Sequence, residues 1–171
     1  MAQQYVNRTN RALGFARIQL RALEEAQTRK GWSQEMQIGA LEAAVCFHLS
    51  VAMHAYRREI AERYTLPTES IHSLEDLLEI QQLQGQATGE ATEFSVLHEQ
   101  QDSWLNQLDQ RYQACWNSDS SPAKGSETSS SEISLVQIEP GKAKPTELSL
   151  EMLYSELYAL INRQRSAMQE W

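Results

Sequence analysis

One stretch of the chain has the residue types and spacing of a metal site. Glu69 and His72 are three positions apart, which is the Glu-x-x-His spacing that di-iron sites in helical bundles use. Such a site needs this element on two helices, together with two further inward-facing Glu residues. The sequence holds one usable copy, and it straddles a predicted loop. We therefore predict no metal ligands and no cofactor.

Two histidines and two cysteines are the other candidates for chemistry. His48 and His54 lie in one predicted helix and point about 240° apart, so they cannot share a metal ion. Each is interpreted as a core or boundary histidine that is hydrogen-bonded to a neighbour. Cys46 lies in the most apolar run, where burial raises the pKa of a thiol and lowers its reactivity. Cys46 and Cys115 form no CxxC pair, and both are interpreted as reduced, buried thiols.

Longer catalytic motifs are missing from the sequence. It contains no G-x-S-x-G, no P-loop and no G-x-G-x-x-G, the patterns that mark nucleophile elbows and phosphate-binding loops. Serine is abundant only in residues 117–132, a segment that could not hold a general base in place. We predict no catalytic residues and no cofactor-binding residues, and a protein that is not an enzyme.

Residues 33–64 form the stretch around which the other elements must be organised. Between Ala40 and Tyr56 the only polar residues are Glu42, His48, Ser50 and His54. A helix that is apolar nearly all the way round lies either at the centre of a bundle or in a membrane. The charges of Glu42 and Arg57 leave an apolar run too short to span a bilayer. We therefore predict a buried central helix and no membrane.

A first helix is predicted before this stretch. Between residues 5 and 30 the apolar positions recur at steps of three and four, the pattern of one buried helix face. Gly31 is a helix-stop signal, and Ser33 is a suitable N-cap for the next helix. Such a short connection predicts an antiparallel hairpin of two helices.

Further helices are predicted after it. A short helix over residues 74–83 is expected, with Ser73 as its N-cap and Leu83 among its inward-facing leucines. A longer helical segment over 90–116 follows, with an interruption at 100–103 as an alternative. The sequence thus predicts an all-α fold, an antiparallel bundle of four to five helices.

The chain is expected to divide into three parts. Residues 1–116 form the bundle core, and residues 117–146 form a disordered, Ser-rich linker that contains a short apolar segment at 133–139. Residues 147–171 form a last helix with apolar positions at heptad-like spacing. We expect this helix to pack back on the bundle.

Charge is distributed unevenly along the sequence. The formal net charge is −8, and residues 64–110 carry nine acidic residues and no Lys or Arg. Nucleic-acid binding needs a basic surface, so nucleic acid is disfavoured as a partner. The acidic segment is either a solvated face or a docking surface for a basic partner. Whether it or the last helix would be the binding surface stays open.

Four sequence stretches carry a resemblance. They are YVNRTNRALGFARIQL, EAAVCFHL, DSWLNQL and the terminal INRQRSAMQEW. In these the chain resembles a family of small uncharacterised proteins of gammaproteobacteria, known as a domain of unknown function. The resemblance covers nearly the full length outside the Ser-rich segment. It implies a shared fold and brings no assigned activity.

A more distant resemblance concerns the central helix followed by IHSLEDLL. This part looks like the HEPN class of helical bundles, some of which cut RNA through an Arg followed, four to six residues later, by a His. The nearest pair here is Arg63 and His72, with eight residues between them. The nuclease motif is therefore missing.

These observations lead to one expected function and one alternative. We expect a non-enzymatic, cytoplasmic helical bundle that acts through protein–protein interaction, with a protein partner or as a homodimer. The alternative is a degenerate HEPN-like bundle that binds a nucleotide or RNA.

Overall fold

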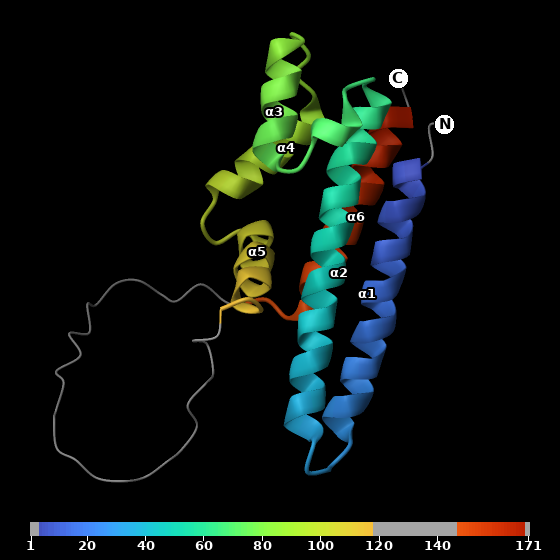
Figure 1. The fold of residues 1–171 in the computed structure, drawn as a ribbon, viewed down its shortest axis with the longest axis vertical. Helices are drawn as coiled ribbons and strands as arrows, with labels where there is room; N and C mark the ends of the chain where they lie inside the picture. Colours follow the sequence, from blue (N-terminus) through green and yellow to red (C-terminus); the bar gives the residue numbers. More distant parts are fainter. Residues whose placement is uncertain (1–3, 118–146, 170–171) are drawn as a thin grey trace, which may run out of the picture.

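Three long helices run side by side. The computed structural model describes residues 4–117 and 147–169, and in these two ranges every regular element is helical. Helices α1 (Gln4–Thr28) and α2 (Gln34–Arg63) form the predicted antiparallel hairpin, and α6 (Leu150–Gln169) lies along both of them (Figure 1). The predicted all-α class is confirmed.

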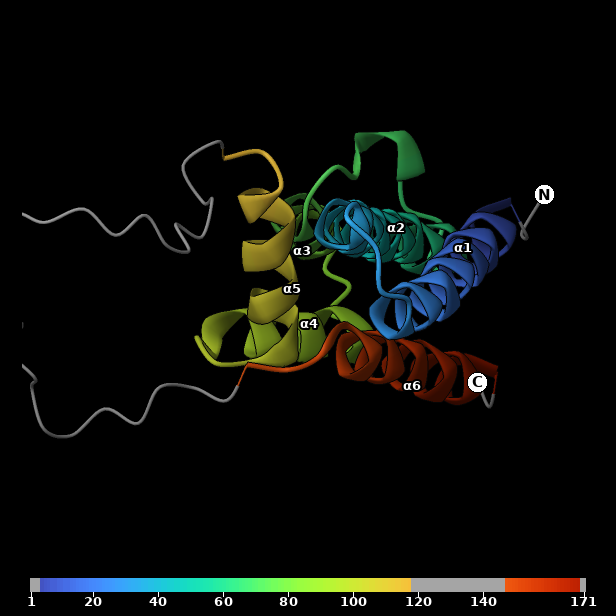
Figure 2. The ribbon, with the colours of Figure 1, turned by 90° about the horizontal axis from the view of Figure 1, so that it is seen from below.

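Shorter helices form a second group beside α2. They are a 3₁₀ helix η1 (Thr68–Ser70), α3 (Leu74–Leu83), α4 (Gly89–Glu99) and α5 (Trp104–Ala114). Figure 2 shows α2 between α1 and this group. Helix α2 contacts α1, α3, α5, α6 and η1, so it has the central position that its composition predicts.

Burial of α2 is nevertheless uneven along its length. Val45, Leu49 and Tyr56 are completely buried or nearly so, whereas Met36 and Phe47 are exposed. The predicted burial of this helix therefore does not hold for residues 34–44, none of which is buried. The reason is that the turn end of the hairpin extends beyond α5 and α6 (Figure 1), so α1 alone packs against α2 there.

The apolar character of α2 also bears on membranes. Within the described ranges, α2 is the one helix long and apolar enough to cross a bilayer by length and composition alone. The core helix of a soluble protein meets the same two criteria, and one such helix is weak support for a membrane span.

Capping residues fix the ends of the shorter helices. Ser73 and Asp76 form the predicted capping box at the start of α3. Ser103 caps α5 by accepting a hydrogen bond from the Asn106 backbone N–H. The Asn106 side chain also donates to the carbonyl oxygens of His98 and Gln100, at 2.8 and 2.7 Å. These bonds interrupt the 90–116 segment, so the described residues contain six α-helices rather than four to five.

The turn between α1 and α2 is closed differently from the prediction. Ser33 makes no side-chain cap hydrogen bond, and Gly31 does not adopt the left-handed backbone conformation. Instead the Gln34 side chain donates to the carbonyl oxygens of Ala26 and Gln27, each at 3.1 Å. This amide satisfies orphan carbonyls at the end of α1.

Two large apolar residues at helix ends are exposed, and one of them, Leu83, was predicted to face inward. Leu83 is 79% exposed and Trp116 is 67% exposed, because each lies at or beyond the end of its helix, where no neighbouring helix covers it. In α3 the buried position near the end is Gln81, whose amide donates to the Thr88 hydroxyl at 2.9 Å.

Helix α6 buries its predicted apolar seam against α1 and α2. The buried positions are Leu150, Leu153, Leu157, Leu160, Ile161, Gln164 and Met168. The predicted linker at 117–146, its apolar segment at 133–139 and the terminal Trp171 lie outside the described residues, apart from residue 117.

The α6 seam gives a stability prediction. Leu157 is completely buried, so Leu157→Ala should lower the free energy of unfolding by about 2–5 kcal/mol through lost burial and a cavity. The matched control is Glu156→Ala, which changes an exposed residue in the same turn. Urea titration followed by circular dichroism measures both. Equal midpoints for the two variants would mean that α6 is not packed in solution.

Candidate functional site

The second half of α6 carries a polar network that joins three helices. The Arg165 guanidinium donates to both carboxylate oxygens of Glu59, at 2.6 and 2.7 Å. Glu59 in α2 is only 5% exposed. Arg165 also donates to the Asn10 side chain at 2.8 Å and lies over the ring of Tyr56. A bidentate pair of this kind fixes both distance and orientation.

Gln164 extends the network to α4. The Tyr56 hydroxyl donates to the Gln164 amide oxygen at 3.0 Å, and the Gln164 amide nitrogen donates to the Glu93 carboxylate at 2.8 Å. Arg163 pairs with the same carboxylate from the solvent side. Burial raises the pKa of Tyr56, and the charge of Glu59 raises this pKa further. The phenol therefore stays protonated and acts as a hydrogen-bond donor.

A depression of about 600 Å³ lies beside this network. Its polar lining groups are already engaged, since Arg63 donates to the Met168 carbonyl at 2.6 Å and the Tyr64 hydroxyl donates to Glu90 at 3.0 Å. The network therefore has the properties of a structural clamp that joins α6 to α1, α2 and α4, and its groups offer no free nucleophile or base.

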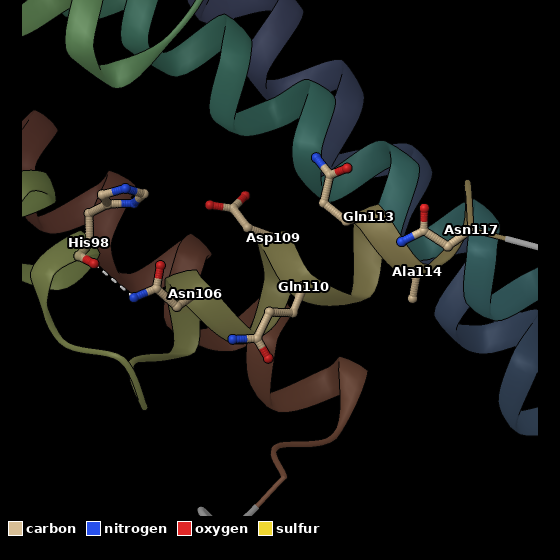
Figure 3. Close-up of a pocket in the computed structure, with 7 residues that line it drawn as sticks. All are labelled: His98, Asn106, Asp109, Gln110, Gln113, Ala114 and Asn117. Carbon is tan, nitrogen blue, oxygen red and sulfur yellow. Dashed lines mark hydrogen bonds between the residues drawn. The ribbon is translucent and has the colours of Figure 1, made fainter. Parts of the chain in front are cut away.

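A second depression, of about 350 Å³, lies along α5. The ring of His98 and the carboxylate of Asp109 point toward one another across it (Figure 3). Burial raises the pKa of Asp109, while the nearby charges of Arg57 and His98 oppose the shift. His98 also lies 3.8 Å from Glu75. The described residues hold no group of three or more side chains that could bind a metal ion.

The residues of the Glu-x-x-His element have separate partners. Glu69 accepts a hydrogen bond from the Tyr5 hydroxyl at 3.0 Å. His72 lies 3.4 Å from the Arg58 guanidinium. Arg63, the Arg of the HEPN-like comparison, instead bonds to the backbone of α6. The structure therefore does not bring Arg63 and His72 into one site.

The two histidines of α2 have different surroundings. His48 is half-buried between the rings of Phe15 and Phe47, each with its centroid 5.3 Å from the imidazole centroid. Burial lowers the pKa of His48, so it is neutral near pH 7. His54 is exposed. The boundary position predicted for these residues fits His48, and His54 lies further out.

Apolar side chains gather around His48 on the outer side of the hairpin. Phe47 is 47% exposed and Ile18 is 61% exposed, while Phe15 and Val51 are each close to 40%. Ile18 lies about one helical turn from Phe15, and Val51 one turn from Phe47. We call Phe15, Ile18, Phe47 and Val51 the hairpin face; Met36, which is also exposed, lies nearer the turn.

Sequence reasoning missed most residues of the polar network around Arg165. The terminal Arg-Gln-Arg is distinctive in sequence, but its partners Glu59 and Tyr56 were not singled out. A signal was present, because Glu59 falls in register with the buried residues Leu49, Ala52 and Tyr56 of α2. A charged residue at such a position indicates a buried partner.

Comparison with known proteins gives one match. A family of unknown function, DUF6586, matches residues 1–171. Comparison with curated proteins and with solved structures gave no match. The predicted resemblance to an uncharacterised family is confirmed, whereas no comparison supports the HEPN-like one.

The clamp gives a second stability prediction. Arg165→Met should cost about 3–5 kcal/mol of unfolding free energy, because it leaves the Glu59 carboxylate buried without its partner. Arg163→Met is the matched control, since the Arg163 side chain is 64% exposed and an exposed pair contributes at most about 1 kcal/mol. Thermal and urea unfolding at pH 7 compare the two. A loss for Arg165→Met no larger than for Arg163→Met would refute the clamp.

Proposed function

Because the chain belongs to the DUF6586 family, whose function is unknown, we propose a function from its own surface: it binds another protein through the hairpin face and does not catalyse a reaction. The observation that carries the proposal is that Phe15 and Phe47 are exposed on either side of a half-buried His48. The exposed Ile18 and Val51 lie one helical turn from them. Contiguous exposed apolar surface of this kind is typical of interaction sites.

The composition of α2 supports this surface. In a folded protein outside a membrane, a helix that is apolar on nearly every side is surrounded by other elements. Helices α3, α5 and α6 cover its inner sides, and α1 covers one flank. The outer side that carries Phe47 and Val51 is left open, so it is the side on which a further helix fits.

The hairpin face also specifies the chemistry of its partner. His48 is neutral near pH 7 because burial lowers its pKa, so the centre of the face carries no charge. The exposed Arg11 guanidinium lies 5.2 Å from the centroid of the Phe15 ring. The partner is thus an amphipathic helix with an apolar stripe for the centre and a carboxylate opposite Arg11.

Other surfaces are less suited to docking. The apolar seam of α6 is buried by its own chain. Several carboxylates of the acidic 64–110 segment are engaged internally, among them Glu69, Asp76, Glu90 and Glu93. The alternative of a nucleotide- or RNA-binding HEPN-like bundle has no supporting observation in the described residues. In this proposal the protein is cytoplasmic, and α2 is its core helix.

The test is affinity capture of the full chain from its native cells. The double variant Phe47→Ser/Val51→Ser changes only exposed side chains and should leave the helical circular dichroism intact. Leu83→Ser, which removes an exposed leucine far from the hairpin face, is the matched control. We expect the wild type and Leu83→Ser to capture the same partner protein. A purified helical segment of that partner should bind the double variant at least about tenfold more weakly than it binds the wild type.

Two outcomes would overturn the proposal. One is a folded double variant that retains the same partner with the same affinity. The other is a wild-type dimer, seen by light scattering without any partner, that the double variant dissociates. That result would assign the hairpin face to a second copy of the chain.

A further inference from the structure

The turn between α1 and α2 exposes a tryptophan at the end of the hairpin. Trp32 is 99% exposed, the highest value for a large apolar side chain in the described residues. Met36, in the first turn of α2, is 78% exposed. The turn extends beyond the other described helices (Figure 1), so none of them covers these two side chains. We call residues 29–36 the hairpin tip.

Positive charge lies beside Trp32 in the hairpin tip. Arg29 and Lys30 are both exposed, and no acidic residue occurs between Glu25 and Glu35. Arg29 pairs with Glu25 at 3.3 Å, but the two side chains are 71% and 68% exposed, and a pair so open to water is weak. The tip thus combines an uncovered aromatic side chain with basic side chains.

Acidic charge lies at the opposite end of the fold. Helices α3 and α4 each carry three acidic residues and no Lys or Arg. Both helices lie toward the end of α2 that is farther from the hairpin tip (Figure 1). An anionic surface therefore attracts the tip and repels α3 and α4. Both effects turn the tip toward such a surface.

Hydrogen bonds hold the hairpin tip in a closed turn. The Gln34 backbone N–H donates to the Gly31 carbonyl at 3.1 Å. The Gln34 side chain donates to the carbonyl oxygens of Ala26 and Gln27, each at 3.1 Å. These bonds join the ends of the two helices and leave Trp32 outside the bundle. Its side chain can therefore enter another medium without any unfolding of the hairpin.

We propose that the hairpin tip docks on an anionic lipid surface, with Trp32 inserted at the level of the headgroups. Trp is enriched at membrane–water interfaces, and basic side chains beside it bind anionic headgroups. A projecting tip reaches a flat bilayer without hindrance from the other described helices, whereas a protein partner would need a pocket for a single Trp. The binding is reversible, because one aromatic and two basic side chains carry it.

Such docking is peripheral and leaves the hairpin face free. An interfacial element enters the bilayer by about 5–10 Å. Phe47 lies about 20 Å along α2 from its first residue, Gln34, so the hairpin face stays above the headgroups. No transmembrane segment is required, and the charges of Glu42 and Arg57 in α2 are no obstacle. The inference goes beyond the proposed partner binding and does not depend on it.

The experiment mixes the full chain with vesicles of equal parts phosphatidylglycerol and phosphatidylethanolamine, and sedimentation measures the bound fraction. We expect the wild type to bind, and brominated acyl chains to quench its tryptophan fluorescence. Trp32→Ala should weaken binding at least about tenfold, because the burial of an aromatic side chain is lost, and should remove the quenching. Trp116→Ala is the matched control, since it removes an exposed Trp outside the tip, and it should change neither result.

Charge gives a second readout. Lys30→Gln should weaken binding to the same vesicles about fivefold, and added salt should weaken the binding of the wild type. Arg8→Gln also removes one exposed positive charge from α1, but about 30 Å from Lys30, so it should leave the binding unchanged. Vesicles of phosphatidylcholine alone should bind the wild type more weakly.

The inference fails on any of three results. One is a wild-type chain that does not sediment with the phosphatidylglycerol vesicles at low salt. Another is a Trp32→Ala variant with intact helical circular dichroism that binds them as tightly as the wild type. The third is a loss of vesicle binding in Phe47→Ser/Val51→Ser that Trp32→Ala does not share, which would assign the lipid contact to the hairpin face.

Discussion

The structure depends on the need to cover α2. This helix has 30 residues, and its apolar residues are spread around most of its circumference. Burial of apolar surface is the dominant favourable term in folding. One neighbouring helix covers only one side of α2, so several helices are needed to bury its apolar residues. Helix α1 therefore packs on one side, α6 on a second, and the α3–α5 group on a third (Figure 2).

A buried charge then sets the register of these contacts. Glu59 occupies a buried position of α2, and burying an unpaired carboxylate costs far more than any single apolar contact gains. Arg165 must lie opposite it. A slide of α6 by one turn would move the guanidinium by about 5.4 Å, which is enough to break the bidentate pair. Apolar packing therefore brings α6 to the bundle, and Glu59 determines where along α2 it stops.

Local signals were enough to predict most of the elements. The capping box of Ser73 and the short turn after α1 lie within a few residues of what they specify, so the α3 boundary and the hairpin could be read from the sequence. Features that depend on distant residues could not. The exposure of Leu83 depends on which helix lies nearby, and the pairing of Glu59 with Arg165 depends on the docking of α6. The exposure of Cys115, which was predicted to be buried, depends on where α5 ends.

The docking of α6 has a consequence for how the protein is made. Arg165 bonds to Asn10 and Glu59, so α6 binds residues that the ribosome synthesises more than 100 positions before it. The α1–α2 hairpin joins neighbours in sequence and can form early, whereas α6 pays the entropy of closing a long loop. Throughout synthesis the groove that α6 fills remains open and apolar. The nascent chain therefore exposes this apolar groove until α6 has been synthesised, which is the condition under which incomplete chains aggregate.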